Sequence, residues 1–210
     1  MALLGAAAAT TSAVATDRQR AGRTARQADV LDAFEALILA EGFRHLTVGE
    51  VAARLGCSRR TLYDLAPSKD DLVALAVERY LDGFLADCMT EIARHRSPAR
   101  QLEASAALVT ERFAALSPAF TADLVATPRL AALVTTFTNR FADGLEAVVD
   151  AGVRQGVFRR VHPRLVAEAI LGLVDRLQDP AVLAELGLTY DEAARQVAGL
   201  FLDGIRASRG

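Results

Sequence analysis

The stretch from Thr47 to Leu72, TVGEVAARLGCSRRTLYDLAPSKDDL, constrains the fold more than any other part of this chain. Thr47 is followed three residues later by Glu50, which is the capping-box pattern that opens a helix. Gly56 is placed to end that helix, because glycine readily takes the left-handed conformation found after a helix C-terminus. Ser58 is suited to cap the next helix. The stretch therefore predicts two short helices joined by a tight turn, a helix-turn-helix.

The second of these two helices begins with basic side chains. Arg59 and Arg60 fall in its first turn, and Leu62 is set to point inward. Helix-turn-helix proteins insert the N-terminal end of this helix into the major groove of DNA. Ser68 and Asp71 form a further capping-box pattern, which predicts that a third helix begins at once. The arrangement predicts double-stranded DNA as a partner.

This stretch resembles the DNA-binding end of the TetR family of one-component transcriptional regulators. The matching residues are Thr47, Val51, Ala52, Leu55, Gly56, Ser58, Thr61, Leu62, Tyr63, Ser68, Lys69 and Leu72. The family usually carries an aromatic pair after the tyrosine, where this chain has Leu65 and Ala66. The resemblance implies a dimeric regulator, most often a repressor, that binds a palindromic operator and is released by a small effector. The apolar helix faces of the larger domain suggest that this effector is mostly apolar. The alternative is a DNA-binding regulator without a small-molecule pocket that is controlled by a protein partner.

Side-chain chemistry suggests how the DNA contacts divide. Arg59 and Arg60 are candidates for base edges, because arginine binds guanine in a bidentate manner. Thr47, Tyr63 and Lys69, the only lysine of the chain, are better placed for phosphates, which position a protein without reading sequence. The full set of candidate DNA contacts is Thr47, Ser58, Arg59, Arg60, Thr61, Tyr63, Lys69 and Arg26. Residues 16–27 also carry Arg18, Arg20 and Arg23, and either a solvated tail or a DNA-binding arm fits them.

The charge distribution agrees with DNA contact at one end only. The chain has a formal net charge of −2, which excludes a uniformly basic nucleic-acid coat. Residues 1–69 hold nine basic against seven acidic side chains, and residues 70–210 hold fifteen against nineteen. No run of about 18 apolar residues is present, so no membrane span is expected, and the protein is expected to be cytoplasmic. The sequence shows no nucleophile–base pair, metal-ligand cluster or phosphate loop, so we expect no enzyme activity, no cofactor and no metal.

Proline marks most of the remaining helix starts. Five of the six prolines follow a residue that can cap a helix, and proline is favoured at the first helical position. With the capping-box pattern of Thr189 and Glu192, this predicts helices over 69–95, 98–115, 118–126, 128–154, 163–178, 180–186 and 190–207. A helix over 24–41 precedes the helix-turn-helix. The prediction is an all-α protein of about nine main helices: a disordered leader (1–23), a three-helix DNA-binding domain (24–68), and a helical effector-binding and dimerisation domain (69–210).

The apolar faces of the larger domain allow two interpretations. Most must form a core, but a ligand cavity between helices is also expected of such a domain. The candidate wall residues are Phe84, Cys88, Phe113, Phe137 and Phe141. The last two long helices are either buried within one chain or paired with a second copy. The resemblance implies pairing in a four-helix bundle, so we predict a homodimer through Ala169, Ile170, Leu173, Leu177, Ala194, Val197, Ala198 and Phe201.

Overall fold

The computed structural model describes residues 25–207, and every regular secondary-structure element in this part of the chain is a helix. The first covers residues 25–41. The others are α2 (Val48–Arg54), α3 (Arg59–Tyr63), α4 (Lys69–Arg94), α5 (Pro98–Ala114), α6 (Pro118–Val125), α7 (Pro128–Arg154), α8 (Pro163–Leu177), α9 (Pro180–Leu186) and α10 (Tyr190–Ile205). The all-α prediction is confirmed. The predicted leader, 1–23, lies outside the described residues. None of the described helices is both long and apolar enough to cross a membrane.

Local capping explains where several helices begin. Reciprocal capping boxes form between Thr47 and Glu50 and between Thr189 and Glu192, as the sequence predicts. Ser68 also caps its helix, since its hydroxyl accepts from the Asp71 backbone N–H at 3.1 Å. The Asp71 carboxylate accepts from that hydroxyl at 2.6 Å. In a full capping box this carboxylate would accept from the Ser68 backbone N–H, and that bond is not among those of the described residues. Aspartate is one methylene shorter than glutamate, which accounts for the difference.

The five helices predicted from proline all begin at the proline itself. Only two of the preceding side chains make a capping hydrogen bond: Ser117 accepts from Phe120 N, and Asp179 accepts from Ala181 N. The other three starts rest on the fixed φ of proline and on its missing N–H, which leaves one fewer donor to satisfy.

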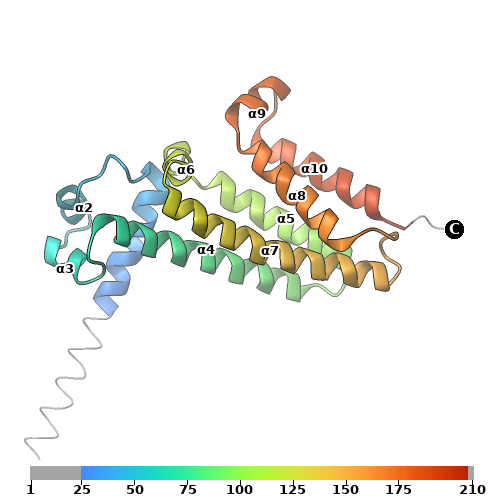
Figure 1. Ribbon diagram of the computed structural model, residues 1–210, viewed down its shortest axis with the longest axis horizontal. Coiled ribbons are helices and arrows are strands. Elements are labelled where there is room, and N and C mark those ends of the chain that lie inside the picture. Colours follow the sequence, from blue (N-terminus) through green and yellow to red (C-terminus); the bar gives the residue numbers. More distant parts are fainter. Residues whose placement is uncertain (1–24, 208–210) are drawn as a thin grey trace, which may run out of the picture.

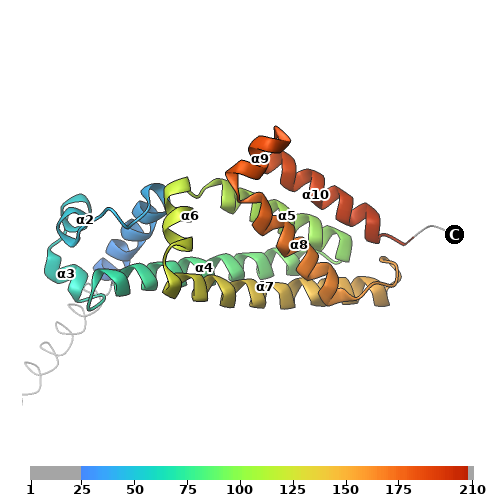
Figure 2. The same ribbon diagram turned by 45° about the horizontal axis from the view of Figure 1, so that its top comes forward.

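The helices form an elongated molecule with two distinct ends (Figure 1). α2 and α3 lie at one end, and α8 and α10 lie toward the other. The long helices α4 and α7 run side by side between them, as both views show (Figure 2). α4 starts directly beside α3, so a displacement of α4 would be felt at α3.

The buried side chains divide into two clusters along this axis. The head cluster joins the first three helices to the start of α4, and it includes Phe120 of α6 and Leu130 of α7. The body cluster is formed by the rest of α4 with α5, α7, α8 and α10. Leu65 and Ala66, which replace the aromatic pair of the family, both pack in the head cluster. The division proposed at residue 68 therefore follows a helix boundary, but the core of the head extends across it.

Two helical glycines provide a matched test of packing. A Cβ on Gly152 in α7 would lie 2.0 Å from the ring of the buried Phe158, whereas a Cβ on Gly83 in α4 would meet no atom within 4 Å. We expect Gly152→Ala to lower the free energy of unfolding by about 1–3 kcal/mol. We expect Gly83→Ala to raise it by about 0.5–1 kcal/mol, because alanine favours the helix. Urea unfolding measures both, and equal effects would contradict this packing.

Candidate nucleic-acid interface and ligand cavity

The turn between α2 and α3 is built as the sequence predicts. Gly56 adopts a left-handed conformation with φ of 60°, which ends α2. Ser58 then caps α3, its hydroxyl accepting from the Thr61 backbone N–H at 3.1 Å. Val51 and Leu62, from the two helices, are both buried in the head cluster. The buried contacts hold α3 by one side and leave its other side at the surface.

The exposed side of α3 carries the predicted base-reading residues. Arg59 and Arg60 are both exposed, and half of Tyr63 is accessible to solvent. The two arginines differ in their surroundings. The Arg59 guanidinium lies close to Gly49 in α2, where it occupies the space that a Cβ would need. Arg60 makes no hydrogen bond or ion pair with the described part of the chain. Arg60 is therefore available to a ligand without breaking any described contact.

Thr47 and Arg26 lie at the borders of this surface. Thr47 is exposed but its hydroxyl is held by the Glu50 carboxylate at 2.7 Å. Arg26 is exposed on the first helix. Burial raises the pKa of the Cys57 thiol, and the positive charge of Arg26 opposes that shift. The charge of Arg26 therefore acts at the α2–α3 turn, and its contact with a phosphate stays a prediction.

Lys69 has a structural role that the sequence did not indicate. Its Nζ donates to the backbone carbonyls of Leu46 and, at 3.2 Å, of Arg44. The contacts tie the loop before α2 to the first residue of α4. An ammonium group has three protons, so one donor remains for a phosphate. The phosphate contact of Lys69 stays a prediction, to which the structure adds this loop anchor.

A cavity of about 560 Å³ lies between the helices of the body. That volume is in the range of drug-sized ligand sites, which span roughly 300–1,000 Å³. α4, α5, α6, α7, α8 and α10 all contribute to its walls. The apolar helix faces of the larger domain therefore enclose a potential ligand site. They do not pack into a solid core, which was the other interpretation of these faces.

Aromatic rings form one wall of the cavity. Phe84 stacks on Phe137 with centroids 5.2 Å apart, and Phe137 stacks in turn on Phe141 at 6.1 Å. Phe113 meets Phe84 edge-on at 6.2 Å. Four of the five predicted wall residues thus line the cavity. The prediction for Cys88 is wrong, because this side chain does not border the cavity. It is fully buried in the body cluster, where desolvation raises the pKa of its thiol to about 12.

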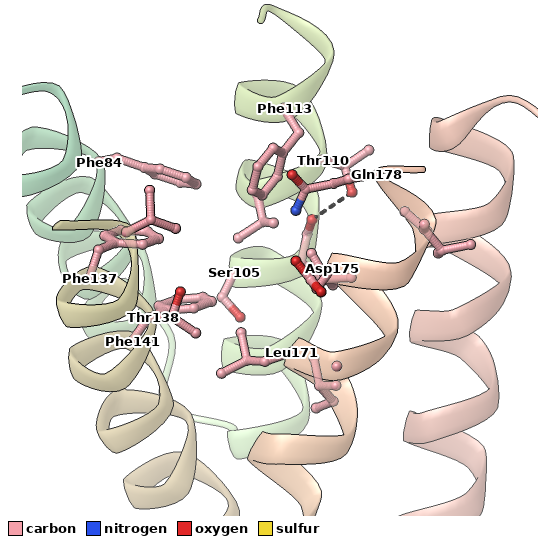
Figure 3. A pocket seen from close by; sticks show the side chains of 18 of the residues that line it. Phe84, Ser105, Thr110, Phe113, Phe137, Thr138, Phe141, Leu171, Asp175 and Gln178 are labelled. Carbon is pink, nitrogen blue, oxygen red and sulfur yellow. Dashed lines mark hydrogen bonds between the residues drawn. The ribbon is translucent and has the colours of Figure 1, made fainter. Parts of the chain in front are cut away.

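Three polar residues of the cavity wall, Asp175, Gln178 and Tyr190, were not predicted. Figure 3 shows Asp175 and Gln178 of α8 near Thr110 of α5, across from Phe84 and Phe137. Tyr190, the first residue of α10, also lines the cavity, and its ring centroid is 5.9 Å from that of Phe113. Its phenol oxygen is buried with no hydrogen-bond partner among the described residues. Helical periodicity identifies apolar faces, but it gives no signal for single polar residues that turn toward a space between helices.

Most of the predicted dimer residues face this cavity. Six of the eight line it, which corrects the prediction that they form an outer face: Ile170, Leu177, Ala194, Val197, Ala198 and Phe201. Ala169 and Leu173 remain exposed. The reason is that α8 and α10 have apolar side chains on more than one face, and periodicity alone does not tell which face meets solvent. The exposed faces instead carry Leu165, Ala169, Gly172 and Leu173 on α8 and Gly199 and Leu200 on α10.

α6 connects the cavity to the head. Phe120 lines the cavity and also packs edge-on against Phe43, at 6.2 Å between ring centroids. Asp123, on the same helix, accepts from the backbone N–H groups of Phe43 at 2.7 Å and Arg44 at 2.9 Å. The residues between the first helix and α2 are therefore held both by Asp123 of α6 and by Lys69 of α4.

Comparison with known proteins agrees with this architecture. The sequence model of a family described as bacterial regulatory proteins, tetR family, matches residues 30–76, which include the whole helix-turn-helix. Residues 30–76 therefore form a DNA-binding domain of the TetR family, which is a family of regulatory proteins and not of enzymes. A curated TetR-family relative, the HTH-type transcriptional repressor KstR2 of Rhodococcus jostii (strain RHA1), is 26% identical over 200 residues, covering 88% of this chain and 93% of the relative.

Solved structures of other transcriptional regulators have the same fold over most of the chain. A putative transcriptional regulator from Saccharomonospora viridis in complex with choline has a TM-score of 0.75 at 18% identity, covering 88% of this chain and all of that one. The regulator FadR from Bacillus subtilis in complex with stearoyl-CoA has a TM-score of 0.66 at 16% identity, covering 85% of this chain and 98% of that one. The two ligands differ greatly, so the shared fold does not determine what a given member binds.

Proposed function

We propose that this TetR-family regulator is a dimeric repressor that binds a palindromic operator and is released when a mostly apolar small molecule enters the cavity. In this proposal residues 24–68 bind DNA, and residues 69–210 bind the effector and form the dimer. The observation that carries it is the connection of the exposed α3 to a cavity of about 560 Å³ through α4 and α6. The cavity also favours a small-molecule effector over control by a protein partner alone.

The DNA-binding part of the proposal rests on the exposed side of α3. Arg59 and Arg60 reach base edges, with Ser58 and Thr61 beside them, while Tyr63 contacts the backbone. Thr47, Lys69 and Arg26 bind phosphates around this site. The exposure of Arg60 and Arg26 supports this division.

Selection of bound DNA from a random pool tests the operator. We expect a palindromic consensus whose half-sites are about 10–10.5 base pairs apart, or a multiple of that spacing, because two recognition helices related by a twofold axis must both reach the major groove. Enrichment of a single half-site, or no enrichment, would count against a dimeric operator-binding protein.

The dimer part rests on the exposed faces of α8 and α10. Leu165 and Leu200 are 67% and 74% exposed, and Leu173 is 41% exposed, which is unusual for large apolar side chains that lie on adjacent helices. Gly172 and Gly199 lie on the same faces, and a Cβ on either would meet no atom within 4 Å. Small residues of this kind allow helices of a second copy to approach closely, in a twofold interface.

Charging this face tests the dimer. The double variant Leu173→Arg, Leu200→Arg removes four leucines from a dimer interface, so we expect dimer affinity to fall on the order of 10⁴-fold at ~1.5 kcal/mol per leucine. Analytical ultracentrifugation should then show a monomer at micromolar concentration. Leu186→Arg on α9 is the matched control, because Leu186 is 54% exposed outside these faces. A double variant that remains dimeric would rule out this interface.

A further inference from the structure

We infer that the cavity selects a cationic amphiphile, an apolar body carrying an ammonium group that donates hydrogen bonds, over a carboxylate of the same length. The inference rests on the proposed role of the cavity as the effector site, and it adds the charge and hydrogen-bonding class of the effector. Four properties of the described wall residues support it: the aromatic rings, the direction of the hydroxyl protons, a carboxylate with no described basic partner, and the absence of cationic side chains among them.

The aromatic wall suits both parts of such a ligand. Phe84, Phe113 and Phe137 offer apolar surface to a hydrocarbon body, and the faces of aromatic rings attract cations. One cation already uses this property, because the Arg112 guanidinium carbon lies 6.0 Å from the centroid of the Phe84 ring. Arg112 does not line the cavity and is held by an ion pair with Asp87.

The wall hydroxyls mostly present lone pairs. Ser105 donates its proton to the Leu102 carbonyl at 3.0 Å, and Thr110 donates to the Ala106 carbonyl at 2.9 Å. Thr121 and Thr135, which also line the cavity, donate to backbone carbonyls in the same way. A hydroxyl has one proton and two lone pairs, so each of these groups can only accept from a ligand. They favour a ligand whose polar end donates.

The charges on the walls have one sign. The lining residues include two carboxylates, Glu168 and Asp175, and among these described residues there is no Arg, Lys or His. Glu168 is neutralised by Arg164, whose Nε lies 2.7 Å from Oε1. Asp175 has no described basic nitrogen within 4 Å, and Figure 3 shows it beside Thr110, facing the aromatic wall. Asp175 is exposed at the rim of the cavity, so water screens its charge in part. An ammonium bound beside it would still gain an opposite charge, whereas a carboxylate would be repelled there.

The donors at the cavity do not reverse this preference. Gln178 offers an amide N–H, and Tyr190 offers its buried, unpartnered phenol. Burial raises the pKa of Tyr190 to about 12, so this phenol is neutral at physiological pH. Neutral donors can bind a hydroxyl or carbonyl of the ligand, but they do not supply the positive charge that a buried carboxylate needs.

Isothermal titration of the full chain with three ligands of equal length tests the inference. The ligands are n-octylamine, n-octanol and octanoate at pH 7.5, where the first is cationic and the last anionic. We expect octylamine to bind most tightly and octanoate most weakly, with about a tenfold or greater difference between them from the ion pair and cation–π contact. Asp175→Asn should remove most of this difference. Glu185→Gln on α9 removes the same charge away from the cavity and should preserve it.

The outcomes separate this inference from the proposed function. If octanoate binds as tightly as octylamine, or if Asp175→Asn leaves the preference unchanged, the charge selection is wrong while the cavity remains a ligand site. If none of the three ligands binds, both the charge selection and the effector role of the cavity are wrong. Operator selection from random DNA is independent of either result.

Discussion

Replacing Arg60 with alanine is expected to weaken binding to the selected operator by about 30-fold to 10⁴-fold. A bidentate contact between arginine and guanine contributes about 1–3 kcal/mol of discrimination, and a dimer loses two of them. Arg60 is exposed on α3 and makes no described contact within the chain, so its removal leaves the fold intact. Fluorescence anisotropy with labelled operator and with scrambled DNA, at fixed salt, measures the loss of specificity.

Arg59 and Arg54 are informative comparisons for this experiment. Arg59 must leave its position against Gly49 to reach DNA, so Arg59→Ala is expected to have a smaller effect than Arg60→Ala. Arg54→Ala removes a charge that is paired with Glu41, and it should leave sequence preference unchanged. If Arg60→Ala instead weakens all sequences equally and reduces the salt slope by about one per subunit, Arg60 contacts a phosphate and not a base.

The local signals in the sequence predicted the head and the helix boundaries well. Caps, glycine stops and proline starts are short-range features, so the start of α4 at Lys69 and of α7 at Pro128 needed no tertiary information. Four phenylalanines of the cavity were also identified, because large aromatic side chains on helix faces must pack somewhere. That these side chains share one cavity depends on the spacing of six helices. No single segment of the sequence determines this spacing.

The wrong and missing predictions have the same physical cause, which is that they depend on contacts between segments far apart in the sequence. Cys88 lies one turn from Phe84, and both are buried in the body cluster, yet only Phe84 also borders the cavity. α8 and α10 each have two apolar sides, and only the packed structure distinguishes the side facing the cavity from the side facing solvent. The sequence gives no signal for the role of Asp123, because its two backbone partners lie about 80 residues earlier in the chain.

Asp123 is where we expect the second large effect, a loss of effector response. Its carboxylate holds the backbone of Phe43 and Arg44 to α6, and α6 borders the cavity with Phe120, Thr121 and Leu124. A ligand that displaces α6 therefore moves the loop that leads into α2. Coupling between two sites typically changes affinity by about 5–150-fold. We expect Asp123→Ala to reduce that factor to near one, while Asp123→Asn, which keeps a carbonyl acceptor, should retain part of it.

Operator release in the presence of the strongest compound from an effector screen measures this coupling. Asp150→Ala on α7 is the control, because Asp150 pairs only with Arg154 on its own helix among the described residues. Ligand affinity must be measured in parallel, since a variant that binds the effector as wild type but no longer releases DNA has lost communication and not binding. If Asp123→Ala responds like wild type, the signal passes through α4 instead. The ion pair between Arg129 of α7 and Asp71 of α4, at 2.7 Å, would then be the contact to test next, because it also joins a cavity helix to the base of the head.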